Sequence, residues 1–290
     1  MVRRLLKSRR GRFLAGFALS SGIALFAYKR RSLTKVGALG AVATGSTLFG
    51  LGGGSSALSL IYFFVSSTLL SHFRSKEKAS TAADKFSKSS QRDLAQVAAN
   101  GGAATLCAVA AGAARSEEWQ QTLQAGLVGA LATANADTWA TEIGVLSSHK
   151  PRLLTTGKPV APGTSGGITP LGSTASALGA LTLGLISWAT RGLRKKESHL
   201  PWIALVSGMS GSLCDSLLGA TVQAMYICPR CQQETERTVH SCGTRTKSLR
   251  GIPWCDNDVV NFCATCCGAL VAMVLHRAIA LSPEDKKTDL

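Results

Sequence analysis

Two stretches of this sequence place acidic residues at or inside apolar segments. The stretch "NADTWATEIG" (135–144) holds Asp137 and Glu142, and "GMSGSLCDSLLGATVQ" (208–223) holds Asp215. A carboxylate near hydrocarbon is costly, so it is a candidate for function wherever it occurs. Hard oxygen ligands of this kind suit Mg²⁺. We therefore treat Asp137, Glu142 and Asp215 as candidate catalytic and magnesium-binding residues.

Helical geometry limits how these acids can meet. Asp137 and Glu142 are five residues apart, or roughly 140° around a helix. They reach one cation only if the helix ends or loosens near them, and the alternative is a helix end whose acids are solvated. Asp215 shares a narrow face with Gly208, Gly211 and Gly219, which indicates close packing between helices. Its alternative is a hydrogen bond to Ser or Thr of a neighbouring helix.

A glycine-rich loop supplies a second kind of chemistry. In "PRLLTTGKPVAPGTSGGITPLG" (151–172) the glycines precede an apolar helix. Glycine permits turns that aim backbone N–H groups at an anion, and a helix N-terminus favours negative charge. The loop predicts a phosphate cradle, against the alternative of a flexible connector. Its candidate phosphate contacts are Arg152, Lys158, Gly163, Thr164, Gly166 and Gly167.

Amide side chains complete the set. "CDNDVVN" (255–261) opens the last apolar segment with Asp256, Asn257 and Asn261, and "QVAANGG" (96–102) contains Asn100. A single helix cap explains one of the residues in the first stretch, not all of them. We add Asn100, Asp256, Asn257 and Asn261 to the candidate substrate-binding residues.

The elements that must position these residues are apolar and nearly uncharged. Such segments occupy 36–71, 94–114, 119–136, 168–190, 203–227 and 259–275, and several can cross a hydrocarbon core of about 30 Å. A soluble helical bundle would need charged outer faces, which these segments lack. We predict an all-α, polytopic transmembrane bundle of about 7–8 helices in one integral-membrane domain, 1–290. The helices are expected near 13–28, 34–50, 55–71, 94–114, 119–136, 168–190, 201–226 and 259–281.

Basic residues give the chain a net charge of +16, and they gather mainly in loops. Counting crossings places 29–35, 72–93, 137–167 and 227–258 on one side, which the positive-inside rule makes cytoplasmic. No basic face is interleaved with aromatic residues, so we do not expect nucleic-acid binding. The basic segment 1–30 is read as a targeting segment or a first helix, and the basic N-terminus fits the charge count poorly.

Seven of the nine cysteines lie from Cys228 onward. In the polar loop 227–258, "CPRCQQETERTVHSC" offers Cys228, Cys231, His240 and Cys242, a set that can hold tetrahedral Zn²⁺. Cys263, Cys266 and Cys267 are expected to act as small apolar residues of the last helix.

The motifs "ADTWATEIG", "PRLLTTGKPVAPGTSGG", "DSLLGATVQ" and "DNDVVN" resemble the integral-membrane family of transmembrane protein 19 and the plant phytyl-phosphate kinase, over roughly residues 30–275. The resemblance implies a kinase that uses CTP or another NTP, with Mg²⁺, to convert an isoprenoid monophosphate to the diphosphate. It implies metal or base roles for Asp137, Glu142 and Asp215, and phosphate contacts at Lys158, Gly163, Thr164 and Gly167. Ser165 stands where this family pattern has Asn.

Three alternatives to the kinase remain at this stage. One is a transporter that uses intramembrane acids for ion coupling. Another is a non-catalytic membrane protein. A third is a CTP-dependent lipid nucleotidyltransferase, which would need the same residues. Sequence leaves open the prenyl chain length, the nucleotide, the oligomeric state and the organelle, with the endoplasmic reticulum and the chloroplast envelope as candidates.

Overall fold

Long helices make up most of the protein. The computed structural model describes residues 8–82 and 91–281, so positions 1–7 of the basic N-terminal segment lie outside the described residues. The helices are α2 (Arg9–Lys29), α3 (Lys35–Thr47), α4 (Gly53–His72), α5 (Ser75–Ala82), α6 (Leu94–Ala113), α7 (Glu117–Gly144), α8 (Pro170–Thr190), α9 (Leu200–Thr221) and α10 (Asn257–Ala280). A π-helical turn, η1 (Leu48–Gly52), joins α3 to α4, and a 3₁₀ turn, η2 (Lys195–Glu197), precedes α9. The predicted all-α bundle is confirmed.

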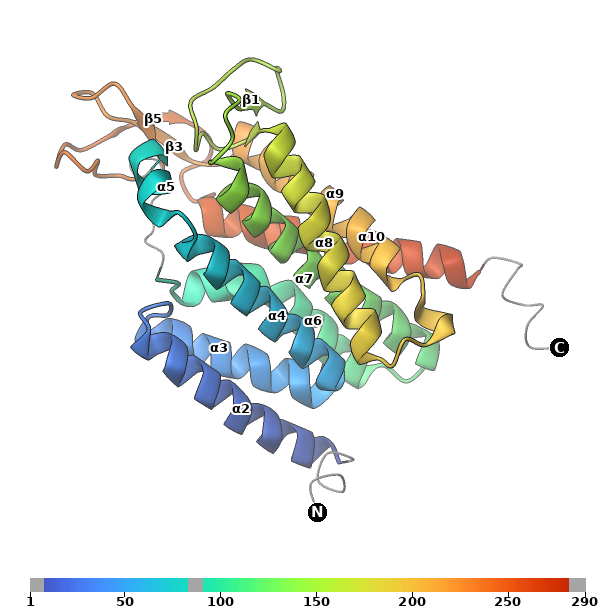
Figure 1. Ribbon diagram of the computed structural model, residues 1–290. Helices are drawn as coiled ribbons and strands as arrows, with labels where there is room; N and C mark the ends of the chain where they lie inside the picture. Colours follow the sequence, from blue (N-terminus) through green and yellow to red (C-terminus); the bar gives the residue numbers. More distant parts are fainter. Residues whose placement is uncertain (1–7, 83–90, 282–290) are drawn as a thin grey trace.

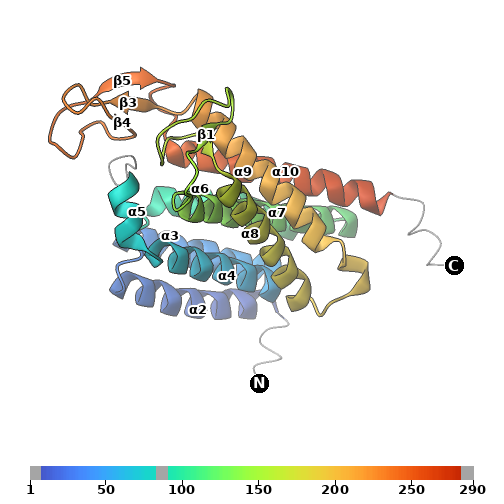
Figure 2. The ribbon, with the colours of Figure 1, turned by 45° about the horizontal axis from the view of Figure 1, so that its top comes forward.

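The strands are short and lie in the loops. β1 (Arg152–Leu153) pairs antiparallel with β2 (Gly167–Ile168). β3 (Met225–Ile227) lies between β4 (Glu234–Thr235) and β5 (Lys247–Arg250) in an antiparallel sheet. Figure 2 shows this sheet projecting beyond the helices, at the end of the bundle that also carries α5 and β1.

Helix α7 is the centre of the bundle. Its middle, from Ala125 to Ala136, is buried throughout, and α4, α6, α8, α9 and α10 pack around it. Helices α2 and α3 form an outer layer beside α6 (Figure 1). Because every face of this part of α7 meets another helix, its residues must be small or apolar, as the run of Ala, Gly, Leu and Val provides.

Glycine allows the helices to approach closely. A Cβ added to Gly129 of α7 would lie 2.4 Å from the Cβ of Ala272 in α10. A Cβ added to Gly208 of α9 would lie 2.6 Å from the Cβ of Ala180 in α8. Both distances are below ordinary contact, so larger side chains would push α7, α8, α9 and α10 apart.

The bundle is suited to a bilayer. Among the described residues, six stretches are long and apolar enough to span a membrane: α2, α6, α8, α9, α10, and 35–72, which runs from α3 through η1 to α4. Large apolar side chains such as Leu39, Leu69 and Val274 are exposed on the outside, where lipid would cover them. The predicted first helix forms as α2, with 21 residues.

The predicted segment 119–136 ends too early, because α7 continues to Gly144. The polar residues after Ala136 remain helical because they line a pocket at the end of the bundle and need not enter a loop. The helix ends where Gly144 meets the first turn of α8, with an added Cβ only 3.3 Å from the Cα of Gly172.

Candidate functional site

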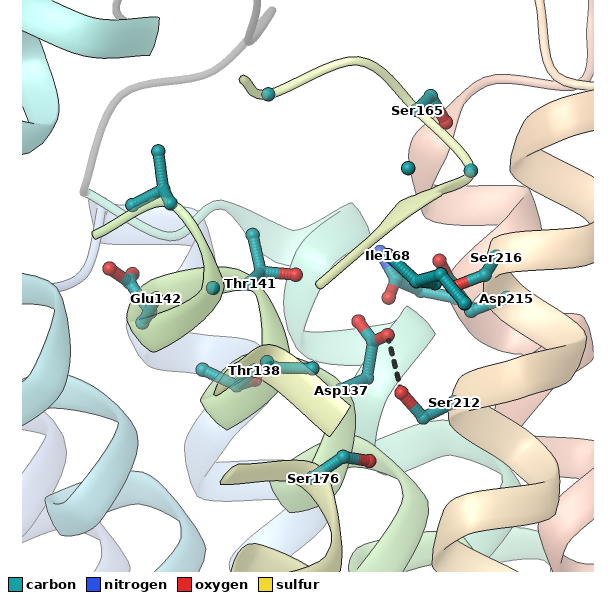
Figure 3. A pocket seen from close by; sticks show the side chains of 18 of the residues that line it. Asp137, Thr138, Thr141, Glu142, Ser165, Ile168, Ser176, Ser212, Asp215 and Ser216 are labelled. Carbon is teal, nitrogen blue, oxygen red and sulfur yellow. Dashed lines mark hydrogen bonds between the residues drawn. The ribbon is translucent and has the colours of Figure 1, made fainter. Parts of the chain in front are cut away.

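A polar pocket of about 320 Å³ lies at the end of the bundle that carries the long loops. Residues from α6, α7, α8, α9 and α10 line it, together with the glycine-rich loop (Figure 3). The predicted site residues among its lining are Asn100, Asp137, Glu142, Gly163, Thr164, Gly166, Gly167, Asp215, Asn257 and Asn261. Segments that are far apart in the sequence therefore meet at one place.

Two carboxylates face each other across this pocket, Asp137 from α7 and Asp215 from α9 (Figure 3). The Ser212 hydroxyl donates to Asp137 Oδ1 at 3.3 Å. Asp215 Oδ2 is buried and makes no hydrogen bond within the described part of the chain. A buried carboxylate oxygen without a partner is costly. Two carboxylates that line one pocket can supply oxygen ligands to one divalent cation.

Glu142 also lines the pocket but points away from Asp137 and Asp215 (Figure 3). Its carboxylate accepts a hydrogen bond from Ser71 at 2.6 Å and pairs with Lys78 of α5 at 2.5 Å. The reason is the regular helix, which keeps residues five apart on different faces. Glu142 therefore does not lie beside the other two acids. That would require α7 to end or loosen near Asp137, and α7 stays regular up to Gly144.

The glycine-rich loop forms one wall of the pocket. Gly163 and Gly166 have positive φ angles of 77° and 82°, which glycine adopts readily. A Cβ on Gly166 would lie 2.6 Å from the backbone nitrogen of Ala220 in α9. The loop then enters α8 through Thr169, whose Oγ1 accepts a hydrogen bond from Gly172 N at 3.0 Å. A helix N-terminus and a tight glycine turn thus face the carboxylates, as the predicted cradle requires.

Three predicted residues lie outside this lining. Arg152 and Lys158 are exposed, and Arg152 Nη1 donates to the carbonyl oxygen of Gly157 at 2.9 Å. The hairpin of β1 and β2 holds both of them away from the pocket. Asp256 is the N-cap of α10 and accepts from the backbone N–H groups of Asp258 and Val259. It orients the helix that presents Asn257 and Asn261.

Arg92 is the one basic residue in the lining of the pocket, among the residues that the structure describes. It precedes Asp93, the N-cap of α6, and its guanidinium lies over the rings of Phe63 and Phe64, 5.9 and 5.6 Å from their centroids. Burial lowers the pKa of Arg92, and the charge of Glu142 acts in the opposite direction. Sequence reasoning used Arg92 only as a loop charge. The sequence "QRDLAQ" could have indicated this position, because Asp93 and Gln96 form a capping box and Arg92 directly precedes it.

Sequence reasoning also missed Glu236, which lines the pocket from the segment after β4. Glu236 Oε1 accepts a hydrogen bond from Gln223 Nε2 at 2.9 Å, and Gln223 Oε1 accepts one from the Ser165 hydroxyl at 2.7 Å. Ser165, the departure from the family pattern, is thus fixed in place. No local pattern marks Glu236, because its position depends on how the sheet folds back.

A second, mainly apolar pocket of about 110 Å³ adjoins the polar one. It lies among α2, α3, α4 and α6, with Leu33, Phe63 and Phe64 in its lining. The two pockets share Arg92, Gln96, Asn100 and Thr138. A polar pocket and an apolar one therefore lie side by side, and Arg92 is the one charged residue among the four that they share.

The predicted zinc ligands Cys228, Cys231, His240 and Cys242 converge in the loop beyond β3. Their ligand atoms all lie within 4.8 Å of one another. They form a cluster of their own in the β3–β5 segment, and none of them lines the polar pocket.

Comparison with known proteins places the chain among membrane proteins. Residues 18–269 match the family described as "Integral membrane protein DUF92". Protein PGR of Arabidopsis thaliana is 33% identical over 270 residues, covering 87% of this chain and 91% of that protein. The "Uncharacterized membrane protein MJ0933" of Methanocaldococcus jannaschii is 32% identical over 198 residues, covering 68% of this chain and 78% of that protein.

The "Uncharacterized membrane protein sll0875" of Synechocystis is 28% identical over 222 residues, covering 77% of this chain and 74% of that protein. No solved structure matches. The match over residues 18–269 and the relatives agree with the multi-pass helical bundle, one end of which carries the candidate site. The chain is an integral membrane protein of the DUF92 family.

Proposed function

We propose that the protein is a lipid-phosphate kinase, which transfers a phosphoryl group from CTP or another NTP to an isoprenoid monophosphate such as phytyl phosphate. One observation carries the proposal: a polar pocket with two carboxylates and a glycine-rich wall adjoins an apolar pocket, and Arg92 lines both. A substrate with a charged head and a hydrocarbon tail has that same division. The resemblance to the phytyl-phosphate kinase family points to the same substrate class.

Arg92 is suited to hold the lipid phosphate where the two pockets meet. A guanidinium offers several N–H donors in a fixed plane and remains charged at neutral pH. The two phenylalanine rings beside it exclude water on the apolar side, which strengthens its attraction for an anion. The tail would lie along α2, α3 and α4 and leave toward the lipid.

The glycine-rich loop is suited to the nucleotide. Gly163, Gly166 and Gly167 allow backbone N–H groups to approach phosphate oxygens without side-chain interference. The first turn of α8 adds the positive end of its dipole. Asn257 and Asn261, from the first turns of α10, supply amide groups on the opposite wall.

The reaction needs no strong base. An oxygen of the lipid monophosphate attacks the terminal phosphorus of the nucleotide, a P–O bond forms, and the bond to the leaving nucleoside diphosphate breaks. The attacking oxygen is already ionised near neutral pH, since the second pKa of a phosphate monoester is about 6. Positioning and charge neutralisation are therefore the main tasks of the site. The lack of histidine in the described lining of the pocket agrees with this chemistry.

Asp137 and Asp215 would hold Mg²⁺, and the unpartnered Oδ2 of Asp215 fits that role. When bound, Mg²⁺ neutralises charge on the transferring phosphates. Ser212 fixes the carboxylate of Asp137 by its hydrogen bond, while Glu142, paired with Lys78, stays out of the ligand set.

The test uses purified full-length protein in detergent with radiolabelled nucleotide, Mg²⁺, and phytyl, geranylgeranyl or farnesyl monophosphate. We expect a prenyl diphosphate that carries label from the terminal phosphate. Arg92→Gln should raise the KM for the lipid phosphate at least tenfold, on the order of the 1.5–3 kcal/mol of a charged hydrogen bond. Arg152→Gln is the matched control and should leave the KM unchanged, since Arg152 is exposed outside the pocket.

Analysis of the products distinguishes the kinase from the other nucleotide-dependent enzyme that would use the same residues. Transfer of the nucleotidyl group, with loss of pyrophosphate, would identify a lipid nucleotidyltransferase instead. No labelled lipid with any of the three substrates and any nucleotide would overturn the proposal.

A further inference from the structure

The segment between α9 and α10 carries a set of groups that the proposed reaction does not use. Cys228 directly follows β3 and opens a turn, Cys231 follows three residues later, and His240 and Cys242 lie beyond β4. Cys228 is fully buried and His240 is 4% exposed. Burial of the Cys228 thiol and the His240 imidazole in so small a sheet needs an explanation, because the sheet has few apolar side chains of its own.

The distances fit a single metal ion. Cys228 Sγ lies 3.6 Å from Cys242 Sγ, and His240 Nδ1 lies 3.2 Å from Cys242 Sγ. A tetrahedral zinc with Zn–S bonds of about 2.3 Å separates its sulfur ligands by about 3.8 Å. A disulfide would need about 2.05 Å between two sulfurs and would leave the other two groups unused. All four ligand atoms converge instead.

The local backbone is shaped for the same purpose. Cys231 N donates to Cys228 Sγ at 3.4 Å, and Gln232 N donates to the Cys228 carbonyl oxygen at 2.8 Å. Gly243, with φ of 79°, closes a turn on His240 through its N–H. Two tight turns thus present the CxxC pair and the HxC pair to each other, an arrangement typical of zinc knuckles.

This cluster connects directly to the wall of the polar pocket. Glu236 lies between the two ligand pairs in the chain and binds Gln223, which in turn binds the Ser165 hydroxyl. From β5, Arg250 Nη1 donates to the Gly219 carbonyl oxygen at 2.7 Å, and Arg250 Nη2 donates to the Ser165 carbonyl oxygen at 3.2 Å. The sheet therefore holds the glycine-rich loop through two sets of hydrogen bonds, one from Glu236 through Gln223 and one from Arg250.

We propose that Cys228, Cys231, His240 and Cys242 bind a structural zinc ion, and that the zinc-bound sheet clamps the glycine-rich loop against α9. Zinc here crosslinks a short segment that could not fold on its own core. Its loss frees Glu236 and Arg250, and with them Ser165. The inference stands independently of the kinase reaction, because it concerns metal content and loop order.

Metal analysis of the full-length protein, purified in detergent under reducing conditions and reloaded with Zn²⁺, tests the site. About one zinc per chain is expected. Cys228→Ser and Cys242→Ser should bind little zinc, while Cys263→Ser, exposed on α10, should bind as much as the wild type. Wild-type protein without zinc, or Cys228→Ser with full zinc content, would overturn the site.

Hydrogen exchange tests the clamp and does not depend on any substrate or on the folding of a variant. Wild-type protein is compared before and after removal of zinc with a chelator, and again after reloading. Backbone amides of residues 163–168 should exchange faster without zinc and recover with it, whereas amides in the middle of α7 should not change. Unchanged exchange in 163–168 would show that the sheet does not hold the loop.

Discussion

Two acidic residues on the last turns of α7 lie in contrasting surroundings. Glu142 has a cationic partner within the protein, Lys78, and a hydroxyl donor, Ser71. Asp137 faces another carboxylate, Asp215, with only the Ser212 hydroxyl bonded to it in the described structure. The two acids belong to one helix and line one pocket. The charge of Glu142 is balanced by Lys78, whereas Asp137 has no such cationic partner among the described residues.

This difference distinguishes an acid that stabilises the fold, Glu142, from one that is a candidate for function, Asp137. An acid paired within the protein satisfies its own charge and fixes neighbouring helices, here α5 against α7. A pair of facing acids costs stability unless a cation from solution joins them. The Asp137–Asp215 pair is therefore the proposed cation site, and the following predictions test its contrast with Glu142.

The largest expected effect is that of Asp137→Asn. Loss of one magnesium ligand should reduce phosphoryl transfer at least about 100-fold, the scale seen when one electrostatic group of an active site is removed. Without divalent cations, the variant should unfold at the same temperature as the wild type or higher, because repulsion from Asp215 is relieved. Thermal unfolding with and without Mg²⁺, beside the kinase assay, measures both effects.

A variant with wild-type activity would remove Asp137 from the metal site. A variant that unfolds early in both conditions would instead show that the carboxylate supports the fold, as Glu142 does.

Gly166→Ala should give the next largest effect. The added methyl group would collide with the Ala220 backbone, and the new alanine would have to adopt a φ of 82°. The loop must therefore move away from α9. We expect a loss of about 1–3 kcal/mol in the free energy of unfolding and weaker nucleotide binding. Gly157→Ala is the control, since φ there is 66° but no atom lies within 4 Å of the new Cβ. Equal losses in the two variants would mean that strain alone, and not contact with α9, fixes Gly166.

Sequence predicted the helical segments and the meeting of the motifs well, for a physical reason. Helices that are apolar on all faces must lie in lipid or inside a bundle, and counting crossings then puts alternate loops at the same end. The count places the segments around Asp137, Asp215 and Gly166 at one end of the bundle, and the packing of α7, α8 and α9 against one another then brings them to one pocket. The connection to Glu236 does not, because a chain reversal in a short sheet leaves no periodic pattern.

Sequence was less able to decide which charged side chains enter the pocket. Sequence reasoning names Lys158, in the glycine-rich loop, as a phosphate contact and does not name Arg92 as a site residue. In the structure, the β1–β2 hairpin exposes Lys158, while the start of α6 directs Arg92 inward. The direction of one side chain depends on the exact start of a helix or hairpin, and such boundaries are what sequence patterns define least.

Glu142→Gln is expected to have a moderate effect, mainly on stability. The change replaces the carboxylate partner of Lys78 by a neutral amide, so the hydrogen bond can persist without the opposite charge, and the cost is at most the roughly 1.5–3 kcal/mol of a charged hydrogen bond. Activity measured well below the melting temperature should stay within a few-fold of the wild type. The double variant Glu142→Gln, Lys78→Met should regain part of the stability, because it leaves no unpaired charge. A fall in activity as large as that of Asp137→Asn would place Glu142 among the metal ligands after all.

Lys158→Ala should have the smallest effect, and it sharpens the contrast between what the family resemblance implies and what the structure places in the pocket. Because Lys158 is exposed and lies outside the pocket lining, its removal should change the free energy of unfolding by less than about 0.5 kcal/mol. The KM for nucleotide should not change, and steady-state kinetics measures it directly. If the KM rises as strongly as it does for the lipid phosphate in Arg92→Gln, then the β1–β2 hairpin must fold over the pocket when nucleotide binds. In that case the glycine-rich loop would be a moving cover rather than a fixed wall.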